Sequence, residues 1–301
     1  MIRNTGLGVF GDILSEAAPE IEKERSWEFF KEGIGSQVML ISTMGALKKD
    51  DKRFLFSTVQ GHAGYAFTIW DTLYLEDYIN LVDESSHKGR AIYHYSRAVQ
   101  AGEWYLESNG LTLGDLIKSK DAKKLLDEKL DDDEADKKII LFLGQSLGGL
   151  INMQKDQSNL LTALPVVKAM FDWVCEKDPN IYNGTCPIFY GAYEAGRPKM
   201  LGGNPEKGKE IFLKAIKDYP NNLLIRIAYI QYYIVPKGDE NAFDEQMAII
   251  ADKKRMIQAR KYWRPFQEKQ NAVEISPRLN LFNATALKRY EILNKNRSEI
   301  F

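Results

Sequence analysis

Apolar residues along the chain recur every three or four positions, which is the spacing of one face of an α-helix. The clearest example is one apolar or small face that consists of Trp27, Phe30, Ile34, Val38, Ile41 and Gly45. No stretch alternates convincingly between apolar and polar residues, as a strand with one buried face would. The pattern therefore predicts an all-α protein.

The same spacing predicts further helices, which are separated by turns rich in proline and glycine. These turns are Asp178-Pro179, Gly196 to Pro205 and Pro236 to Gly238. Residues 111–136 are polar and charged, which predicts short helices at the surface. The longer predicted helices cover residues 54–75, 89–106, 137–153, 164–177, 187–195, 205–218, 223–234, 242–253 and 277–295.

An internal repeat is most evident between residues 164 and 234, where Phe171 returns 41 residues later as Phe212. The second copy has the small–aromatic–small–proline spacing of the second helix of a tetratricopeptide repeat, and residues 91–98 repeat it weakly. Such units bury their apolar faces by stacking. We therefore expect a tetratricopeptide-like superhelix with flanking helices, built for binding. The matching residues are Lys168, Phe171, Pro179 and Asn180 in the first copy and Lys209, Phe212, Pro220 and Asn221 in the second.

The composition is that of a soluble globular protein, with 44% hydrophobic and 28% charged residues in a chain of 301. We expect a single all-helical domain over residues 1–301. Lysine and arginine number 41 against 42 aspartates and glutamates, so the chain has no bulk attraction to the phosphates of nucleic acid. The best apolar run, Leu223 to Val235, is short and contains Arg226, so we expect a buried helix there instead of a membrane span.

Neither the N-terminus nor the cysteines determine whether the protein is cytoplasmic or exported. Residues 1–4 are not followed by the apolar core of a signal peptide, which fits a cytoplasmic protein or an exported domain without its leader. Cys175 and Cys186 flank a turn between two predicted helices, where a disulfide would staple the corner. Two unrelated buried thiols are an equal alternative, and a thiol titration would decide between them.

Residues 144–148, with the sequence Gly-Gln-Ser-Leu-Gly, match the nucleophile motif G-x-S-x-G of hydrolases. A hydrolase of that type needs its histidine after the serine. The three histidines, His62, His87 and His94, all precede Ser146. We therefore interpret the small residues as a surface for close helix packing and expect no catalytic residue, with a Ser146 hydrolase as the least favoured alternative.

Two other patterns imitate ligand sites without the context that those sites need. Residues 6–11 spell the dinucleotide fingerprint, but only five residues precede them, too few for the required strand, so we expect an accident or a flexible N-terminal segment. His87 and His94 lie near Asp83 and Glu84 but lack the spacing of a metal site. The acidic run 131–134 lacks the glycine and the terminal glutamate of a calcium loop and suits a helix start without a metal, so we interpret it as solvated surface. We expect no metal and no cofactor.

Aromatic residues are frequent on the predicted helices, and helical spacing assigns most of them to the core. As a set, they could also line a cleft for an apolar or carboxylate-bearing ligand. Such a cleft would lie between the early aromatic helices and the repeat region, with core packing as the alternative for each residue. The candidates are Trp70, Tyr93 and Trp104 on one side and Tyr190, Tyr193, Tyr229 and Tyr233 on the other.

Several short motifs occur in a characteristic order. They are Arg90-Ala91, Tyr95 and Arg97, Leu141-Phe142 with the helix up to Ile151, Leu164-Pro165, Asp178-Pro179, Gly184, Gly208 to Asp218, Arg278-Leu279-Asn280 and the final Phe301. Together they resemble the T-component proteins of tripartite ATP-independent periplasmic (TRAP) transporters over nearly the whole chain. The chain departs from the family at Leu147, where an aromatic residue is usual, and at Thr185-Cys186-Pro187, where histidine is more frequent.

The resemblance implies an all-α, tetratricopeptide-like periplasmic protein that is lipid-anchored upstream of this chain. It also implies association with the substrate-binding P-component, a homo-oligomer such as a trimer, a ligand-accessible cleft or pore, and no catalytic residues. We therefore expect a non-enzymatic accessory of a solute transporter that binds a partner protein and a small apolar organic anion. The runner-up is a repeat scaffold in another cell-envelope assembly, without a small-molecule ligand.

Overall fold

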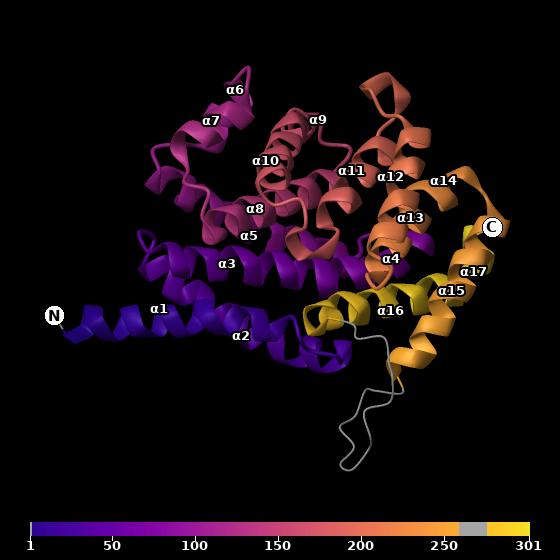
Figure 1. The fold of residues 1–301 in the computed structure, drawn as a ribbon, viewed down its shortest axis with the longest axis horizontal. Helices are drawn as coiled ribbons and strands as arrows, with labels where there is room; N and C mark the ends of the chain where they lie inside the picture. Colours follow the sequence, from indigo (N-terminus) through magenta and orange to yellow (C-terminus); the bar gives the residue numbers. More distant parts are fainter. Residues whose placement is uncertain (1, 259–275) are drawn as a thin grey trace, which may run out of the picture. The chain divides into compact units, whose positions relative to one another are not determined.

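The computed structural model describes residues 2–258 and 276–301, and every regular element within these two stretches is helical (Figure 1). The prediction of an all-α fold is confirmed, and the tetratricopeptide-like architecture stays a prediction. In chain order the elements are α1 (Ile2–Ile21), α2 (Trp27–Leu47), α3 (Lys52–Tyr65), the π-helical η1 (Ala66–Asp71), α4 (Thr72–Ile79), α5 (Ser86–Ser108), α6 (Leu113–Lys118), α7 (Ala122–Lys129), α8 (Glu134–Met153), α9 (Ser158–Leu161), α10 (Leu164–Lys177), η2 (Ile181–Asn183), α11 (Thr185–Gly196), η3 (Lys199–Leu201), α12 (Pro205–Asp218), α13 (Leu223–Tyr229), the π-helical η4 (Ile230–Ile234), α14 (Val235–Lys237), α15 (Glu240–Gln258), η5 (Pro277–Leu279), α16 (Asn280–Lys295) and α17 (Arg297–Ile300).

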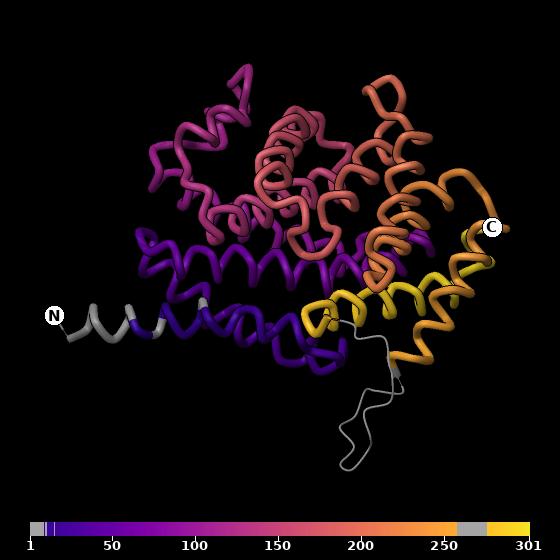
Figure 2. The backbone as a smooth tube through the Cα atoms, in the orientation of Figure 1, coloured from indigo at the N-terminus to yellow at the C-terminus, as the bar shows by residue number. Residues whose placement is uncertain are grey.

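The chain divides into two compact units, and the backbone tube in Figure 2 follows it through both. The first unit contains Met1–Ala18, Lys31–Asp77 and Val82–Pro179, and the second contains Pro19–Phe30, Tyr78–Leu81 and Asn180–Phe301. The expectation of a single domain over residues 1–301 stays a prediction.

Helix α2 buries the face that its periodicity predicts. The Ser26 hydroxyl accepts a hydrogen bond from the Phe29 amide at 3.3 Å, as a residue at a helix N-terminus often does. One apolar face of the helix is then removed from water. Its buried residues are Trp27, Phe30, Ile34, Val38 and Ile41.

Helices α3, α5, α8 and α10 pack together in the first unit, and glycines of α8 bring aromatic rings onto its backbone. A Cβ added to Gly149 would lie 2.6 Å from Cε2 of Tyr95 on α5. A Cβ added to Gly144 would lie 3.3 Å from Cε2 of Phe171 on α10. Both distances are shorter than ordinary van der Waals contact, so these glycines permit the close packing that the sequence predicts for residues 144–149.

Helices α11 and α12 pack closely in the second unit, and glycines again permit the close approach. A Cβ added to Gly191 of α11 would lie 2.7 Å from Cε1 of Phe212 on α12, and one added to Gly208 would lie 2.8 Å from Cβ of Ala195. The neighbouring contact between α13 and α16 is polar, because Asn283 accepts a hydrogen bond from the Leu223 amide at 3.0 Å.

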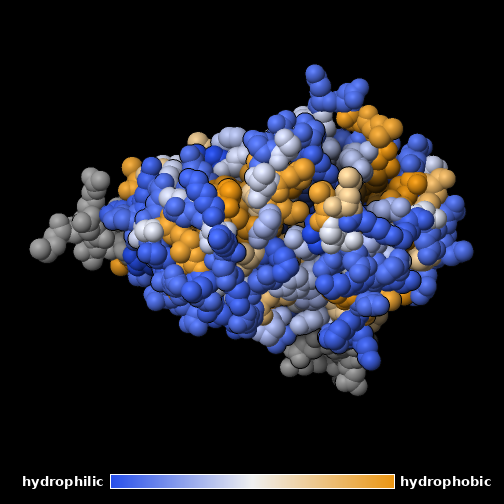
Figure 3. Space-filling view, turned by 90° about the horizontal axis from the view of Figure 1, so that it is seen from above, coloured by the Kyte–Doolittle hydropathy of each residue, from blue (hydrophilic) through white to orange (hydrophobic). Residues whose placement is uncertain are grey.

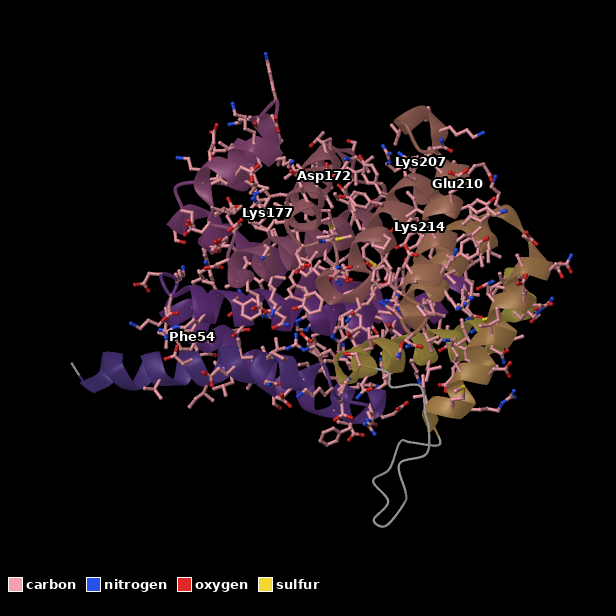
Figure 4. All side chains as sticks on the ribbon, viewed as in Figure 1. Phe54, Asp172, Lys177, Lys207, Glu210 and Lys214 are labelled. Atoms are coloured by element: carbon pink, nitrogen blue, oxygen red, sulfur yellow. The ribbon has the colours of Figure 1, made fainter. Side chains whose placement is uncertain are left out.

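Helix α12 has one buried and one solvated side. The buried side carries Gly208, Phe212 and Ala215. The exposed side carries Lys207, Glu210 and Lys214, which Figure 4 labels on this helix. The separation of small and aromatic residues from charged ones is the amphipathic pattern of a helix packed on one side only.

Helices α10 and α12 have the same length, 14 residues, and their bounds differ by the 41 residues of the sequence repeat. Both end in the same way. The Asp178 amide donates to the carbonyl of Val174 and the Tyr219 amide to that of Ala215, each at 2.8 Å, and Pro179 follows the first of these turns as Pro220 follows the second.

The structure corrects two details of the sequence interpretation. Residues 6–11 lie inside helix α1, so of the two alternatives the flexible N-terminal segment is wrong and the accidental match to the fingerprint remains. The short helices within residues 111–136 are not wholly at the surface, because Leu116 of α6 and Leu126 of α7 are buried. Residues 131–134 are exposed, as expected of solvated surface, and Asp133 at the start of α8 accepts a hydrogen bond from the Asp136 amide at 2.9 Å.

Hydrophilic side chains cover most of the face drawn in Figure 3, and hydrophobic ones show there in separate spots. No helix among residues 2–258 and 276–301 combines the length and the apolar character needed to cross a membrane.

Candidate functional site

Two π-helical segments carry or adjoin three of the aromatic candidates. Trp70 lies in η1 and Tyr233 lies in η4. Tyr229 is the last residue of α13 and directly precedes η4. A π-helical turn bonds residue i to residue i+5, is rare, and often marks a functional site inside a longer helix. The two segments lie in different compact units, so each forms a separate candidate cluster.

The first cluster, here named the histidine–aromatic cluster, consists of His62, Tyr65, Trp70, Arg90 and His94. The Nδ1 atoms of His62 on α3 and His94 on α5 lie 2.9 Å apart. On its other side, Nε2 of His62 lies 2.7 Å from the hydroxyl of Ser42 on α2. The two imidazoles therefore connect three helices of the first unit.

The hydrogen bonds assign the protons of these imidazoles. The Ser42 hydroxyl donates to the Val38 carbonyl at 2.5 Å, so its oxygen accepts from Nε2–H of His62. Nδ1 of His62 is then an acceptor, and Nδ1–H of His94 is the donor to it. This arrangement requires the His62 ring to be neutral, because its Nδ1 accepts a hydrogen bond.

The surroundings keep the two rings neutral. Burial, with smaller contributions from His94 and Arg97, lowers the pKa of His62 to about 3. Burial, followed by the charges of Arg90 and Arg97, lowers the pKa of His94 to about 4. At neutral pH the arginines are therefore the cations of this region, because neither histidine adds a charge.

Aromatic rings extend the cluster around Arg90. The Tyr65 ring lies 4.4 Å from the ring of His94 and 5.4 Å from that of Trp70, measured between centroids. The guanidinium carbon of Arg90 lies 4.6 Å from the centre of the Trp70 ring. A cation held on an aromatic surface can attract an anion that has an apolar body.

Arg90 is exposed and forms no ion pair with any residue of the described stretches. Two acidic side chains of this unit have other partners. Asp77 pairs with His87 at 2.8 Å, and Asp71 accepts from the hydroxyl of Tyr95 at 3.0 Å.

The second cluster, here named the tyrosine cluster, consists of Phe212, Tyr229 and Tyr233 with Glu206 and Lys237. The Tyr229 and Tyr233 rings stack with centroids 5.6 Å apart, and Phe212 lies 5.8 Å from Tyr229. The Tyr233 hydroxyl donates to Glu206 at 2.9 Å, and Lys237 pairs with the same carboxylate at 3.1 Å. Burial and the Glu206 carboxylate raise the pKa of Tyr233 to about 12. The phenol therefore stays a neutral donor.

Tyr190 and Tyr193 lie on α11, where both are half-buried. The Arg197 guanidinium lies 3.7 Å from the centre of the Tyr193 ring, and its Nε donates to the Tyr193 carbonyl at 2.8 Å. Phe189 contacts both tyrosines, with ring centroids 5.3 Å from Tyr190 and 5.5 Å from Tyr193. These rings form a patch that is less buried than the tyrosine cluster.

The remaining two candidates have different surroundings. Tyr93 is 58% exposed and meets His94 edge to face, with centroids 5.0 Å apart. Trp104 lies beneath the ammonium group of Lys49 at 4.2 Å. Tyr93 and Trp70 thus lie at the histidine–aromatic cluster, whereas Trp104 contacts Lys49 instead. A cleft shared with the candidates of the other unit stays a prediction.

Sequence reasoning missed most of the residues that give the first cluster its chemistry. It considered His94 together with His87, but the structure pairs His94 with His62 and His87 with Asp77. The usable signal was the position of His62 between small and apolar residues of a helix with many buried positions. A histidine there requires a buried partner.

Ser146 lies in the middle of α8, fully buried, and its hydroxyl has no hydrogen-bond partner. A nucleophile elbow needs a strand, a sharp turn and an exposed serine, and α8 supplies none of these at this position. No group of three or more histidine, cysteine, aspartate or glutamate residues in the described stretches is arranged to hold a metal ion.

Cys175 on α10 and Cys186 on α11 are both disulfide-bonded in the structure, which leaves neither thiol free. Whether the protein in solution carries this bridge is a prediction that thiol titration tests.

The model of a family described as TRAP transporter T-component matches residues 23–260 of the 301-residue chain. No curated protein matches the chain.

Proposed function

The chain belongs to the TRAP transporter T-component family, and from this membership we propose that it binds a small organic anion and the substrate-binding P-component of a transport system. The family supplies an accessory component on the periplasmic side of TRAP transport. We further propose that this accessory is non-enzymatic, lipid-anchored and able to associate with copies of itself.

The observation that supports an anionic ligand is the unpaired Arg90 on the aromatic surface of the histidine–aromatic cluster. Its guanidinium lies over Trp70, and the neighbouring imidazoles are held neutral. A carboxylate would pair with Arg90, and an attached apolar group would lie against the rings of Trp70, Tyr65 and Tyr93. Arginine suits this role because its planar guanidinium both stacks on rings and binds carboxylates through two hydrogen bonds.

Thermal unfolding and calorimetric titration test this ligand class with matched probes. Benzoate and indole-3-acetate carry the carboxylate, and benzamide and indole-3-acetamide are their uncharged counterparts. We expect the acids to bind and raise the melting temperature, the amides to do neither, and Arg90→Gln to abolish the difference. Arg97→Gln, which removes a cation of the same helix that pairs with Gln100, is the matched control. Equal behaviour of acids and amides would contradict the proposal.

Association with the P-component is tested separately by biolayer interferometry with a purified periplasmic solute-binding protein of a TRAP transport system from the same organism. Saturable binding supports the transport role. Absence of binding, together with absence of a ligand, would favour a scaffold in another cell-envelope assembly.

The disulfide is consistent with an oxidising compartment, where such bridges persist. Thiol titration of the unfolded protein should detect no free thiol before reduction and both cysteines after it. Free thiols in protein purified from its native compartment would contradict both the bridge and its implication for location.

A further inference from the structure

A series of hydrogen bonds in the first unit fixes which nitrogen of His94 carries the proton. The Ser42 hydroxyl donates to the Val38 carbonyl at 2.5 Å, so its oxygen accepts from Nε2–H of His62 at 2.7 Å. Nδ1 of His62 therefore accepts from Nδ1–H of His94 at 2.9 Å. Burial, followed by the charges of neighbouring arginines, lowers the pKa of His94 to about 4, so its second nitrogen, Nε2, is unprotonated at neutral pH. Nε2 of His94 is thus a hydrogen-bond acceptor.

No group of residues 2–258 and 276–301 donates a hydrogen bond to this acceptor. His94 is half-buried, and its Nε2 is not among the polar atoms that these residues bury without a partner. The nitrogen is therefore open to a solute. Since Nδ1 contacts His62, Nε2 lies on the side of the ring away from His62. A lone pair in this position favours a ligand that offers a hydrogen-bond donor.

The acceptor lies on the same face of α5 as the unpaired cation of the cluster. Arg90 and His94 are four residues apart on this helix, which places them one turn from each other. The Tyr65 ring lies between their surroundings, 4.4 Å from the His94 ring and 5.4 Å from the Trp70 ring on which Arg90 lies. A donor on the carbon next to a carboxylate bound by Arg90 therefore lies on the face that carries Nε2 of His94.

We propose that His94 determines the specificity of the anion site by selecting carboxylates that carry a hydroxyl on the adjacent carbon. The carboxylate pairs with Arg90, the hydroxyl donates to Nε2 of His94, and the apolar group lies on the rings of Tyr65 and Trp70. Ser42 and His62 are positioning residues, because they hold the imidazole in the tautomer that accepts. This inference rests on the anion site proposed above and adds the donor that its ligand carries.

The charges around His94 favour a hydroxyl over an ammonium group as the donor. Arg90 and Arg97 both lower the pKa of the imidazole, which shows that a positive charge at this place is unfavourable. A hydroxyl supplies the hydrogen bond without adding a cation. The site should therefore discriminate against 2-amino acids as well as against acids that have no donor.

Calorimetric titration at neutral pH tests the selection with mandelate and phenylacetate, which differ by one hydroxyl. The better enantiomer of mandelate should bind the wild type about tenfold more tightly than phenylacetate, and phenylglycine no more tightly than phenylacetate. Ser42→Ala removes the acceptor for Nε2–H of His62, so the opposite tautomers become accessible and the preference should fall to about twofold or less. Thr43→Ala is the matched control. Thr43 bonds the carbonyl four residues before it in the same way, at 3.0 Å, and contacts neither imidazole, so the preference should remain.

Nitrogen-15 NMR of the imidazoles reads the tautomer without any ligand. In the wild type and in Thr43→Ala, Nε2 of His94 should have the chemical shift of an unprotonated ring nitrogen, and Ser42→Ala should move it toward that of a protonated one. A protonated Nε2 in the wild type would overturn the proposal. Equal binding of mandelate and phenylacetate, abolished for both by Arg90→Gln, would also overturn it but would leave the anion site in place. Failure of both acids to bind would overturn the anion site and this inference together.

Discussion

Glycine residues within the helices let aromatic rings of neighbouring helices lie directly on the backbone. The pairs are Gly144 with Phe171, Gly149 with Tyr95 and Gly191 with Phe212. A ring in such contact excludes water from the helix surface and fixes how closely the helices approach. These glycine–aromatic contacts thus produce the close packing of neighbouring helices that the sequence repeat predicts.

Adding one methyl group at such a pair should destabilise the protein. In Gly191→Ala the new Cβ would lie 2.7 Å from ring carbons of Phe212, which is fully buried and has no space to move into. We expect a loss of about 1–3 kcal/mol, measured by denaturant unfolding. Gly64→Ala is the control, because a Cβ there meets nothing within 4 Å and should add about 0.5–1 kcal/mol through helix propensity. Equal effects of the two substitutions would refute this account of packing.

The neutral pair of His62 and His94 should make stability depend on pH. An unfolded histidine titrates near pH 6.5, whereas burial lowers the pKa in the folded state to about 3 for His62 and about 4 for His94. Below pH 7 the unfolded chain therefore binds more protons, so stability is complete above pH 6.5 and is lost progressively toward the folded-state values. Between pH 7 and pH 5 we expect each histidine to account for a loss of about 2 kcal/mol, so the pair accounts for roughly 3–4 kcal/mol.

Urea unfolding at a series of pH values between 5 and 7 measures this loss. The double variant His62→Gln with His94→Gln should flatten the dependence, since neutral amides replace both rings. His87→Gln keeps the buried pair intact and should retain the wild-type slope. Identical slopes for the wild type and the double variant would mean that other groups cause the dependence.

At the scale of elements, the helices that the sequence predicts best are those with strong signals at both ends. The predicted bounds 164–177 and 205–218 agree with α10 and α12 because Pro165 and Pro205 suit a first turn, and Pro179 and Pro220 prevent continuation. Helix α1 was not predicted, since glycines at 6, 8 and 11 weaken the helical pattern locally. Its contact with α3 offsets this weakness, as Arg53 pairs with Asp12 at 2.6 Å.

The π-helical segments could not be predicted, because neither their amino-acid composition nor the spacing of their apolar residues differs from that of an α-helix. Trp70 and Tyr233 were selected as aromatic residues, but the sequence does not show that each lies in such a turn. The pairing of His62 with His94 was equally inaccessible, because it depends on how α3 and α5 pack. Sequence patterns specify which face of a helix is buried, and contacts between helices decide which polar groups meet there.

The tyrosine candidates should separate into core and surface positions. Tyr233 is buried, stacked on Tyr229 and hydrogen-bonded to Glu206, so Tyr233→Ala should cost about 3–5 kcal/mol. Tyr193 is half-buried under Arg197, so Tyr193→Ala should cost clearly less. Thermal unfolding with native mass spectrometry of any co-purified ligand tests both. Severe destabilisation by both changes, with the ligand retained, would exclude these residues from a binding cleft.

At the scale of the whole molecule, the chain passes repeatedly between its two compact units. The division falls inside α1, between Ala18 and Pro19, and inside α2, between Phe30 and Lys31. A helix that belongs to both units cannot unfold in one of them without losing backbone hydrogen bonds that support the other. The continuity of these helices therefore favours cooperative unfolding, as the expectation of a single domain also requires.

Scanning calorimetry of two matched variants tests this cooperativity. Gly144→Leu overpacks the first unit against Phe171, and Gly191→Leu overpacks the second against Phe212. If the chain is one cooperative domain, both variants should lower the temperature of the same single transition, with calorimetric and van't Hoff enthalpies equal in the wild type. If the units unfold independently, the wild type should show two transitions, and each variant should shift only the one that contains its substitution. That result would replace the single domain by two, each stabilised by its own pair of glycine and phenylalanine.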